Sequence, residues 1–269
     1  MLALFIALLR NLHNDQMAES LYELSEQRAE YLIIHAFEGF GIDVEEAIQL
    51  LKAKDDNTLT EQDRDKVDRL LAAVRNLIEF AVAEEYQLYA EADVLLEHVD
   101  FDDVDDELMD ELEAACERYN KVYATVENED AKYAMAMAAW WIGVGRRDYL
   151  MYMTQGDDRV RPWHAALEGF TARRDDFPSW MIPPIEWGCR CYLVDMAGDS
   201  VQNAATNLHQ VKAKTPEKPP QLNSIFSESV CQCGRIFGEA HPYFTVDEGH
   251  TDMLNGFVER LKEKWYAVE

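Results

Sequence analysis

The stretch LYELSEQRAEYLIIH, residues 21–35, decides the fold of the first half of the chain. Its mainly apolar positions recur three or four residues apart, which is the repeat of one face of an α-helix, at Leu21, Leu24, Arg28, Tyr31, Leu32 and His35. The same spacing runs on in both directions through a region where glycine and proline are nearly absent. The sequence therefore predicts that residues 1–147 are almost entirely helical.

Breaks in this pattern predict where the helices begin and end. Gly39-Phe-Gly41 supplies the stop for the helix that contains residues 21–35. Thr58-Leu-Thr60-Glu61 offers a capping box, which predicts a long helix from Glu61 to about His98. The apolar opening, residues 1–9, is predicted to be a buried helix.

The most acidic run lies at residues 100–117, which hold ten acids in eighteen positions. Apolar residues at helical spacing interrupt the run, so it is predicted to be a solvated acidic helix face. Asp100, Asp102 and Glu111 fall at the first, third and twelfth positions of a calcium loop. The fifth position is Val104, which has no ligand oxygen, and Asp105 stands where the turn needs glycine, so the calcium loop is rejected.

The overall charge limits what the protein can bind. Its 269 residues carry 25 Lys and Arg against 52 Asp and Glu, a formal charge of −27, which repels phosphate backbones and anionic membranes. Residues 146–191 differ, because seven Arg balance seven acids there. The apolar runs at residues 1–9 and 133–144 are too short to span a bilayer. We expect no membrane association and no strong nucleic-acid binding.

Cysteine usage indicates a reducing compartment. There are five cysteines, and four of them form two C-x-C pairs too tight for convenient disulfides within a pair. Reduced thiols are expected in a protein made in the cytoplasm.

After Arg147 the chain changes character, because glycine, proline and aromatic residues become frequent. Short strands and ordered loops are predicted from near Leu150, with one strand at residues 192–194, and a last amphipathic helix is predicted from about His250 to Tyr266. The predicted fold is α+β and predominantly α. Four parts are expected: a helical region at 1–147, a loop-rich Cys/His module at 148–197, a linker or arm at 198–224, and a C-terminal segment with its helix at 225–269.

The module carries the candidate site residues, which lie in three short stretches. The signature consists of Asp157, Asp158, Arg159, Arg161, Pro162, His164, Gly169, Trp180, Pro183, Pro184, Trp187, Cys189, Arg190 and Cys191. No cofactor is expected from the sequence, but a metal, with zinc the first candidate, could be held by His164, Glu186, Cys189 and Cys191. Spacing alone also permits a Cys₄ site with Cys231 and Cys233, or no metal and simply buried thiols with Arg190 paired to a carboxylate.

Two further expectations concern this module. Stiff Pro183-Pro184 and bulky Trp187 are suited to folding the Cys-Arg-Cys turn back on the loop that bears His164. Arg159, Arg161 and Arg190 are expected to pair with the module's own acids, chiefly Asp157, Asp158, Asp175 and Asp176.

Common catalytic motifs are missing from the chain. Ala166 stands where a nucleobase deaminase needs glutamate, and the H-E-x-x-H, G-x-S-x-G and P-loop patterns do not occur. A Cys–His nucleophile pair of His164 with Cys189 or Cys191 stays open. The expectation is a protein that is not an enzyme.

The order Thr-x-Gly-Asp-Asp-x-Val-Arg-Pro-x-His, then Trp180, then Pro-Pro-x-x-Trp-Gly-Cys-Arg-Cys resembles the phage Mu protein F-like minor head proteins, the phage head-morphogenesis family. The resemblance covers about Lys132 to Met196. His241-Pro-Tyr-Phe244 also resembles a motif that some relatives carry near their C-terminal ends.

This resemblance implies a minor structural protein of the virion of a tailed bacteriophage. Such a protein associates with the portal vertex and capsid interior, binds the portal protein and capsid proteins, and assists head morphogenesis or DNA delivery. It would be found in the host cytoplasm before assembly. An enzyme or toxin built on the same Cys/His module is the alternative, because related modules are fused to toxin domains in some bacterial proteins.

Overall fold

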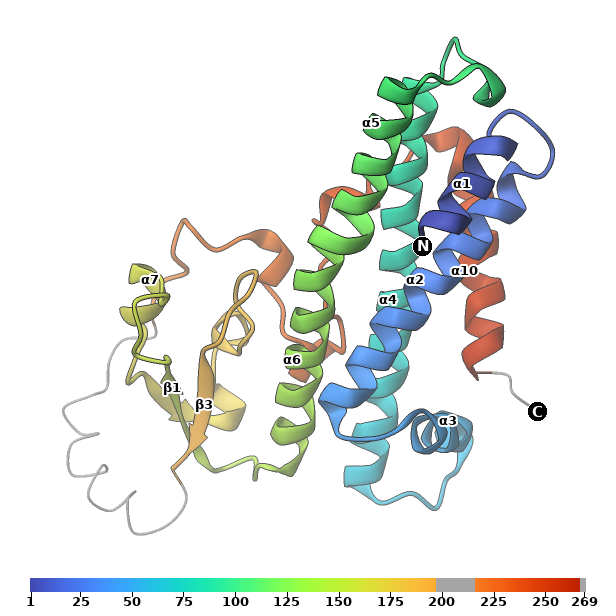
Figure 1. The fold of residues 1–269 in the computed structure, drawn as a ribbon. Helices are drawn as coiled ribbons and strands as arrows, with labels where there is room; N and C mark the ends of the chain where they lie inside the picture. The colour runs from blue at the N-terminus through green and yellow to red at the C-terminus, as the bar shows by residue number, and fades with distance from the viewer. Residues whose placement is uncertain (197–215, 267–269) are drawn as a thin grey trace.

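The computed structural model describes residues 1–196 and 216–266, and it places a helical bundle beside a small sheet (Figure 1). The main helices are α1 (Leu2–Asn11), α2 (Met17–Phe40), α3 (Val44–Lys52), α4 (Glu61–Leu95), α5 (Asp106–Glu117), α6 (Ala124–Gly143), α7 (Pro162–Ala165), α9 (Val230–Cys233) and α10 (Thr251–Tyr266). The strands are β1 (Tyr149–Met153), β2 (Thr171–Arg173) and β3 (Tyr192–Asp195). The predominantly α fold and the helical character of residues 1–147 are confirmed.

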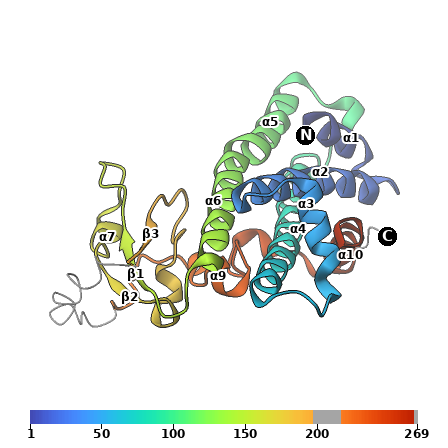
Figure 2. The same cartoon turned by 90° about the horizontal axis from the view of Figure 1, so that it is seen from below.

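The bundle is centred on α2, which packs against α4 and α6 (Figures 1 and 2). Helix α2 ends as predicted, with Gly41 in the left-handed conformation at φ 82°. Helix α1 is the expected buried opening helix, with Phe5, Leu8 and Leu9 in the core. No helix within residues 1–196 and 216–266 is long and apolar enough to cross a membrane.

Helix α4 begins at Glu61 as predicted, but a different residue caps it. The cap is Thr60, whose hydroxyl oxygen accepts a hydrogen bond from the backbone N–H of Asp63 at 3.1 Å. Thr58 instead turns back to Asp56, whose carboxylate accepts both its N–H and its hydroxyl at 2.7 Å. The Asp63 carboxylate accepts from the Thr60 hydroxyl at 2.7 Å, so the cap lies two residues later than predicted and its acidic partner contacts the Thr side chain.

Helices α5 and α6 follow one another through a turn of π-helix at Arg118–Tyr123, and α6 is the helix that lies beside the sheet (Figure 1). Helix α5 is the predicted acidic helix. It starts at Asp106, after the Asp105 side chain caps the backbone N–H of Leu108, and it buries Leu112 and Cys116.

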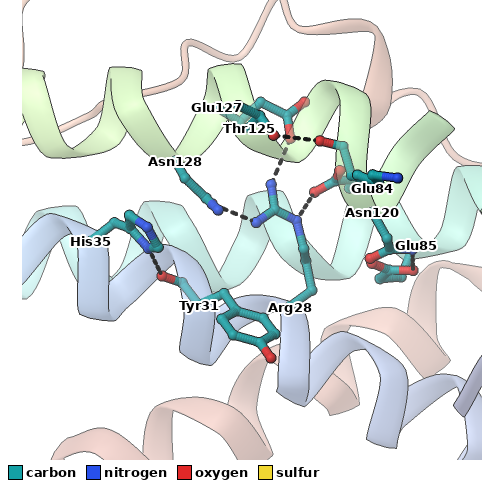
Figure 3. A network of polar contacts seen from close by, with 10 residues as sticks. Arg28, Tyr31, His35, Glu84, Glu85, Asn120, Thr125, Glu127 and Asn128 are labelled. Carbon is teal, nitrogen blue, oxygen red and sulfur yellow. Dashed lines mark hydrogen bonds and ion pairs between the residues drawn. The ribbon is translucent and has the colours of Figure 1, made fainter. Parts of the chain in front are cut away.

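One buried arginine joins the three central helices (Figure 3). Arg28 on α2 is 1% exposed and donates to Glu84 of α4 and to Glu127 of α6, each at 2.6 Å. Its remaining terminal nitrogen donates to Asn128 at 2.7 Å. Burial raises the pKa of Glu84 well above its usual range, and Glu84 and Glu127 share a hydrogen bond. A proton on one carboxyl lets both acids face a single guanidinium.

The sheet is antiparallel with strand order β2-β1-β3. Met151 lies opposite Thr171 on one side and Val194 on the other. Alternate residues of β1, Leu150 and Tyr152, are fully buried, as expected for a strand with one covered face. Strand β3, at Tyr192–Asp195, confirms the strand predicted directly after the second cysteine of the C-x-C pair.

The C-terminal segment lies across the bundle. Asn76 of α4 accepts hydrogen bonds from the N–H groups of Ile236 and Phe237 at 2.8 Å and donates to the carbonyl of Phe237 at 2.9 Å. The Phe237 ring stacks on Phe80 with centroids 4.0 Å apart. Helix α10 is the predicted amphipathic helix, and it packs on α4. The predicted linker at 198–224 falls mostly on residues 197–215, which lie outside the described residues.

Candidate metal centre

The first component of the site is His164, which α7 holds in the interior of the sheet module. Arg161 is extended and Pro162 is the first helical residue, so the single turn of α7 starts at a fixed place. Three residues into the helix, the His164 ring points inward and is 2% exposed.

The second component is the turn that carries the two cysteines. Gly188 has a φ of +62°, a conformation that other residues rarely adopt, and it reverses the chain immediately before Cys189. Cys191 then leads directly into β3. Both cysteines are 3% exposed.

Side chains of helix α6 hold this turn by hydrogen bonds to the backbone of the turn. Both carboxylate oxygens of Asp130 lie 3.0 Å from the N–H of Gly188. One turn further along α6, the hydroxyl of Tyr133 donates to the carbonyl of Cys191. The position of the cysteine turn is therefore set by the bundle, and not by the module alone.

The structure brings His164, Cys189 and Cys191 together in one buried cluster. The Nδ1 atom of His164 lies 3.4 Å from the Sγ atom of Cys191 and 3.9 Å from the Sγ atom of Cys189. All three potential ligand atoms lie within 4.8 Å of one another. The stiff loop around Pro183-Pro184 does fold back on the His-bearing loop.

Glu186 takes a different place from the other three candidates. Its Oε2 atom lies 3.1 Å from Nε2 of His164, on the far side of the ring from the sulfurs. The same oxygen lies 3.1 Å from Nε of Arg161, which also donates to the carbonyl of Trp187 at 2.8 Å. Glu186 thus orients the imidazole and fixes Nδ1 toward the cysteines.

The two thiols have different acidities. A hydrogen bond from Cys189, together with nearby Arg161 and Arg190, lowers the pKa of Cys191 to about 7. The pKa of Cys189 is raised, because it shares its hydrogen bond with Cys191 and is buried. Tyr152 is fully buried beside Cys191, and its hydroxyl makes no well-formed hydrogen bond within the described residues.

The Cys₄ arrangement that spacing permits is wrong for the part of the chain that the structure describes. Cys231 sits on α9, which packs against α6 and α4, and it lines a hollow with Arg69 and Arg174. Cys233 is exposed, and neither residue joins a cluster of potential ligands within residues 1–196 and 216–266.

The arginines of the module follow the expectation only in part. Arg190 donates two hydrogen bonds to the Asp157 carboxylate, at 2.7 and 2.8 Å, as predicted. Arg161 pairs with Glu186 instead of an aspartate, because the loop with the cysteines passes beside it. Asp158 and Arg159 lie exposed in the turn before α7, and no ion pair of theirs occurs among the described residues.

The remaining signature residues shape the module. Gly169, at φ +83°, donates to the carbonyl of Tyr152 at 2.8 Å. Trp180 is buried, and Trp187 stacks on Phe237 of the C-terminal segment with centroids 5.6 Å apart. Pro183-Pro184 has a cis peptide bond.

Sequence reasoning missed Asp130, Tyr133 and Tyr152 as members of the site. Asp130 and Tyr133 are three residues apart on α6, which is ordinary spacing within a helix and carries no signal. The one available hint was Tyr152, which stands in the same stretch as the signature.

His241 is part of the packing and not part of the cluster. It lies between Trp187 and Phe80, with ring centroids 5.6 and 4.9 Å away. Burial lowers its pKa to about 4, so the ring is neutral at neutral pH. The His241-Pro-Tyr-Phe244 stretch therefore ties the C-terminal segment to both the module and the bundle.

Comparison with known proteins finds a family match that includes both the His164–Cys189–Cys191 cluster and the helices that support it. Residues 101–194 match the family described as "Phage Mu protein F like protein". Over this region the chain is similar to that family. The match includes α5 and α6 as well as the sheet module, in keeping with the bonds that Asp130 and Tyr133 make to the cysteine turn.

A relative of the same kind is found among characterised proteins. Over 88 residues the chain is 38% identical to the "Mu-like prophage FluMu F protein" of Haemophilus influenzae, an alignment that covers 32% of this chain. The chain spans only about a fifth of that relative, because the aligned part is 19% of its length. No solved structure matches the chain.

Proposed function

We propose that this protein is a minor head protein of a tailed bacteriophage. In this role it lies in the capsid interior at the portal vertex, binds the portal protein and capsid proteins, and assists head morphogenesis or DNA delivery. The observation that carries the proposal is the match of residues 101–194 to the Mu protein F-like family. The charge of −27 fits this place, because it keeps the protein from adhering to packaged DNA.

The alternative is an enzyme or toxin that uses a cysteine activated by His164. His164 does stand between the sulfur of Cys191 and the carboxylate of Glu186, an order that a nucleophile, its base and an orienting acid would share. A nucleophile must reach its substrate, however, and Cys191 is 3% exposed with a second thiol beside it. The arrangement suits a structural role better, so we propose that the protein is not an enzyme.

The surface for the partner is proposed to lie on the π-helical turn and the start of α6. Val122, Tyr123 and Val126 are 57%, 41% and 43% exposed, and the latter two line a hollow of about 390 Å³ with Trp187. Exposed apolar residues gathered in one place are typical of protein interfaces. The acidic run at residues 100–117, which has ten acids and no basic residue, comes before them in the chain. A partner surface that complements this region would therefore have an apolar centre and a basic rim.

The test is co-purification from cells that assemble the phage. The full-length protein is expected to recover the portal protein. The double change Val122→Glu and Val126→Glu should lower that recovery at least ten-fold while the protein remains folded, because charge is placed in the apolar centre. Val126→Ser separates the loss of apolar contact from the added charge.

The matched control is Val94→Glu on α4, an isolated apolar side chain that is 72% exposed. It adds one of the two negative charges of the double variant elsewhere on the bundle and should leave recovery unchanged. Absence of portal protein with the unaltered chain would overturn the proposed function. Recovery that is unchanged in the double variant would overturn the proposed surface alone.

A further inference from the structure

We propose that His164, Cys189 and Cys191 hold a zinc ion that pins the cysteine turn to the His-bearing loop. The three side chains come from two loops more than twenty residues apart, and each is at most 3% exposed. They converge on one point through Nδ1 and two sulfurs. Nitrogen and thiolate ligands in a compact buried group are the set that zinc prefers.

The distances between the ligand atoms fit a tetrahedral metal. Zinc bonds of about 2.3 Å to sulfur and about 2.0–2.1 Å to nitrogen place a nitrogen and a sulfur ligand about 3.6 Å apart. The two distances from Nδ1 of His164 are 3.4 and 3.9 Å, which fall on either side of this value. Two sulfurs on one zinc lie about 3.8 Å apart, and all three atoms here lie within 4.8 Å of one another.

The surroundings of His164 also match those of a zinc ligand. A ligating imidazole usually gives its second ring N–H to a carboxylate, which fixes the tautomer and strengthens the ligand. Glu186 occupies that position at 3.1 Å from Nε2, and Arg161 balances its charge. Glu186 is therefore a positioning residue, and we remove it from the four ligands that the sequence suggested.

The charges of the site sum to zero when a divalent ion is bound. On binding, each thiol releases its proton to solvent and both sulfurs bond to the metal as thiolates. One Zn²⁺ with two thiolates is neutral, and Glu186 with Arg161 is a neutral pair, so no net charge remains buried. The Tyr152 hydroxyl, buried beside Cys191 without a well-formed hydrogen bond, is available to the fourth position or to a water there.

The zinc content of the purified full-length protein, produced without a histidine tag, is the first test. We expect about one zinc per chain by elemental analysis. The variant with Cys189→Ser and Cys191→Ser should lose it, and so should His164→Ala. Cys231→Ser is the matched control, because it changes a buried cysteine of the other C-x-C pair and should keep the metal.

Cobalt gives a readout that does not depend on stability. Replacement of zinc by Co²⁺ should produce the near-ultraviolet absorption of thiolate–cobalt bonds and the visible bands of a four-coordinate ion. Glu186→Gln should keep the bands but weaken zinc binding about 10–100-fold, as expected for loss of an orienting carboxylate.

Three results would overturn the proposal. They are a folded wild-type chain that neither contains zinc nor develops the cobalt bands, a metal retained when Cys189 and Cys191 are both changed, and a metal lost only with Cys231→Ser. Copper in place of zinc would overturn the choice of metal. None of these results depends on portal binding, so the site and the proposed function can fail separately.

Discussion

Arg28 shows what a single position can and cannot reveal. It stands at the helical spacing of the apolar residues in the stretch 21–35, and the structure places it among the buried residues of α2. Its partners could not be predicted, because Glu84 and Glu127 lie 56 and 99 residues away in the chain. Charged residues on an inner face are satisfied only by the tertiary fold, which spacing along one helix does not contain.

Replacing Arg28 with Met is expected to destabilise the protein by about 3–5 kcal/mol, because two carboxyls lose their buried cation. Equilibrium unfolding in urea measures the change. Arg75→Met is the control, since Arg75 is 64% exposed and pairs with Glu79 one turn away, and that change should cost less than about 1 kcal/mol. Equal losses in the two variants would show that the buried network contributes no more than a surface pair.

The candidate site shows the same limit. The sequence identified His164, Cys189 and Cys191 as possible ligands, because their residue types are distinctive. It could not tell that Glu186 faces the opposite ring nitrogen, since that depends on how two loops meet. It also gave no sign that Asp130 and Tyr133 hold the cysteine turn, because their bonds go to backbone atoms of another element.

At the scale of whole elements, helical spacing predicted the helices well and their mutual packing not at all. The stops and starts near Gly41 and Glu61 were predicted to within a residue because they follow from local capping. That the C-terminal segment would lie along α4 was not predictable, since its anchor is Asn76, one polar residue on a helix. The four-part division of the chain stays a proposal.

Gly39 marks a close approach between α2 and α6. It lies in the last turn of α2, at the helix end that the sequence predicted, and an added Cβ there would stand 1.9 Å from the carbonyl oxygen of Lys132 on α6. Two non-bonded atoms cannot come this close, so only glycine permits α2 and α6 to approach one another at this point. The two helices would have to move apart to accept any other side chain.

Gly39→Ala is therefore expected to destabilise the protein by roughly 2 kcal/mol or more, although alanine favours helices. Gly143→Ala on α6 is the matched control, because nothing lies within 4 Å of the added methyl group. That variant should be neutral or more stable by up to about 1 kcal/mol. Thermal unfolding of both variants checks the sign, and a Gly39→Ala protein as stable as the control would contradict the close packing.

The acidic character of the whole molecule extends to its core, where glutamate side chains are buried. Glu84 and Glu85 are both fully buried on α4, near Glu127, and Arg28 is the cation that faces them. Burial raises the pKa of Glu85 to about 8, although Asn120 and the N-terminal amine act in the opposite direction. One of its oxygens has no hydrogen-bond partner within the described residues. The folded protein thus takes up protons that the unfolded chain has already released.

The stability of the molecule is therefore expected to fall as the pH rises from about 5 to 8. A carboxyl with a raised pKa in the folded state adds stability that is complete below its ordinary value, 4.5, and lost through about 8. Each such group contributes a slope of up to about 1.4 kcal/mol per pH unit within that window. Urea unfolding at a series of pH values measures it.

Glu85→Gln isolates the contribution of this one group. The amide keeps the size of the side chain and cannot ionise, so the variant should gain on the wild type steadily between pH 5 and 8. Part of the slope should remain in the variant, because burial also raises the pKa of Asp130 to about 7 and that of Glu84. Parallel stability curves for the two proteins would mean that Glu85 does not change its protonation on unfolding. A constant offset between such parallel curves would measure only how far the Gln side chain disturbs the packing.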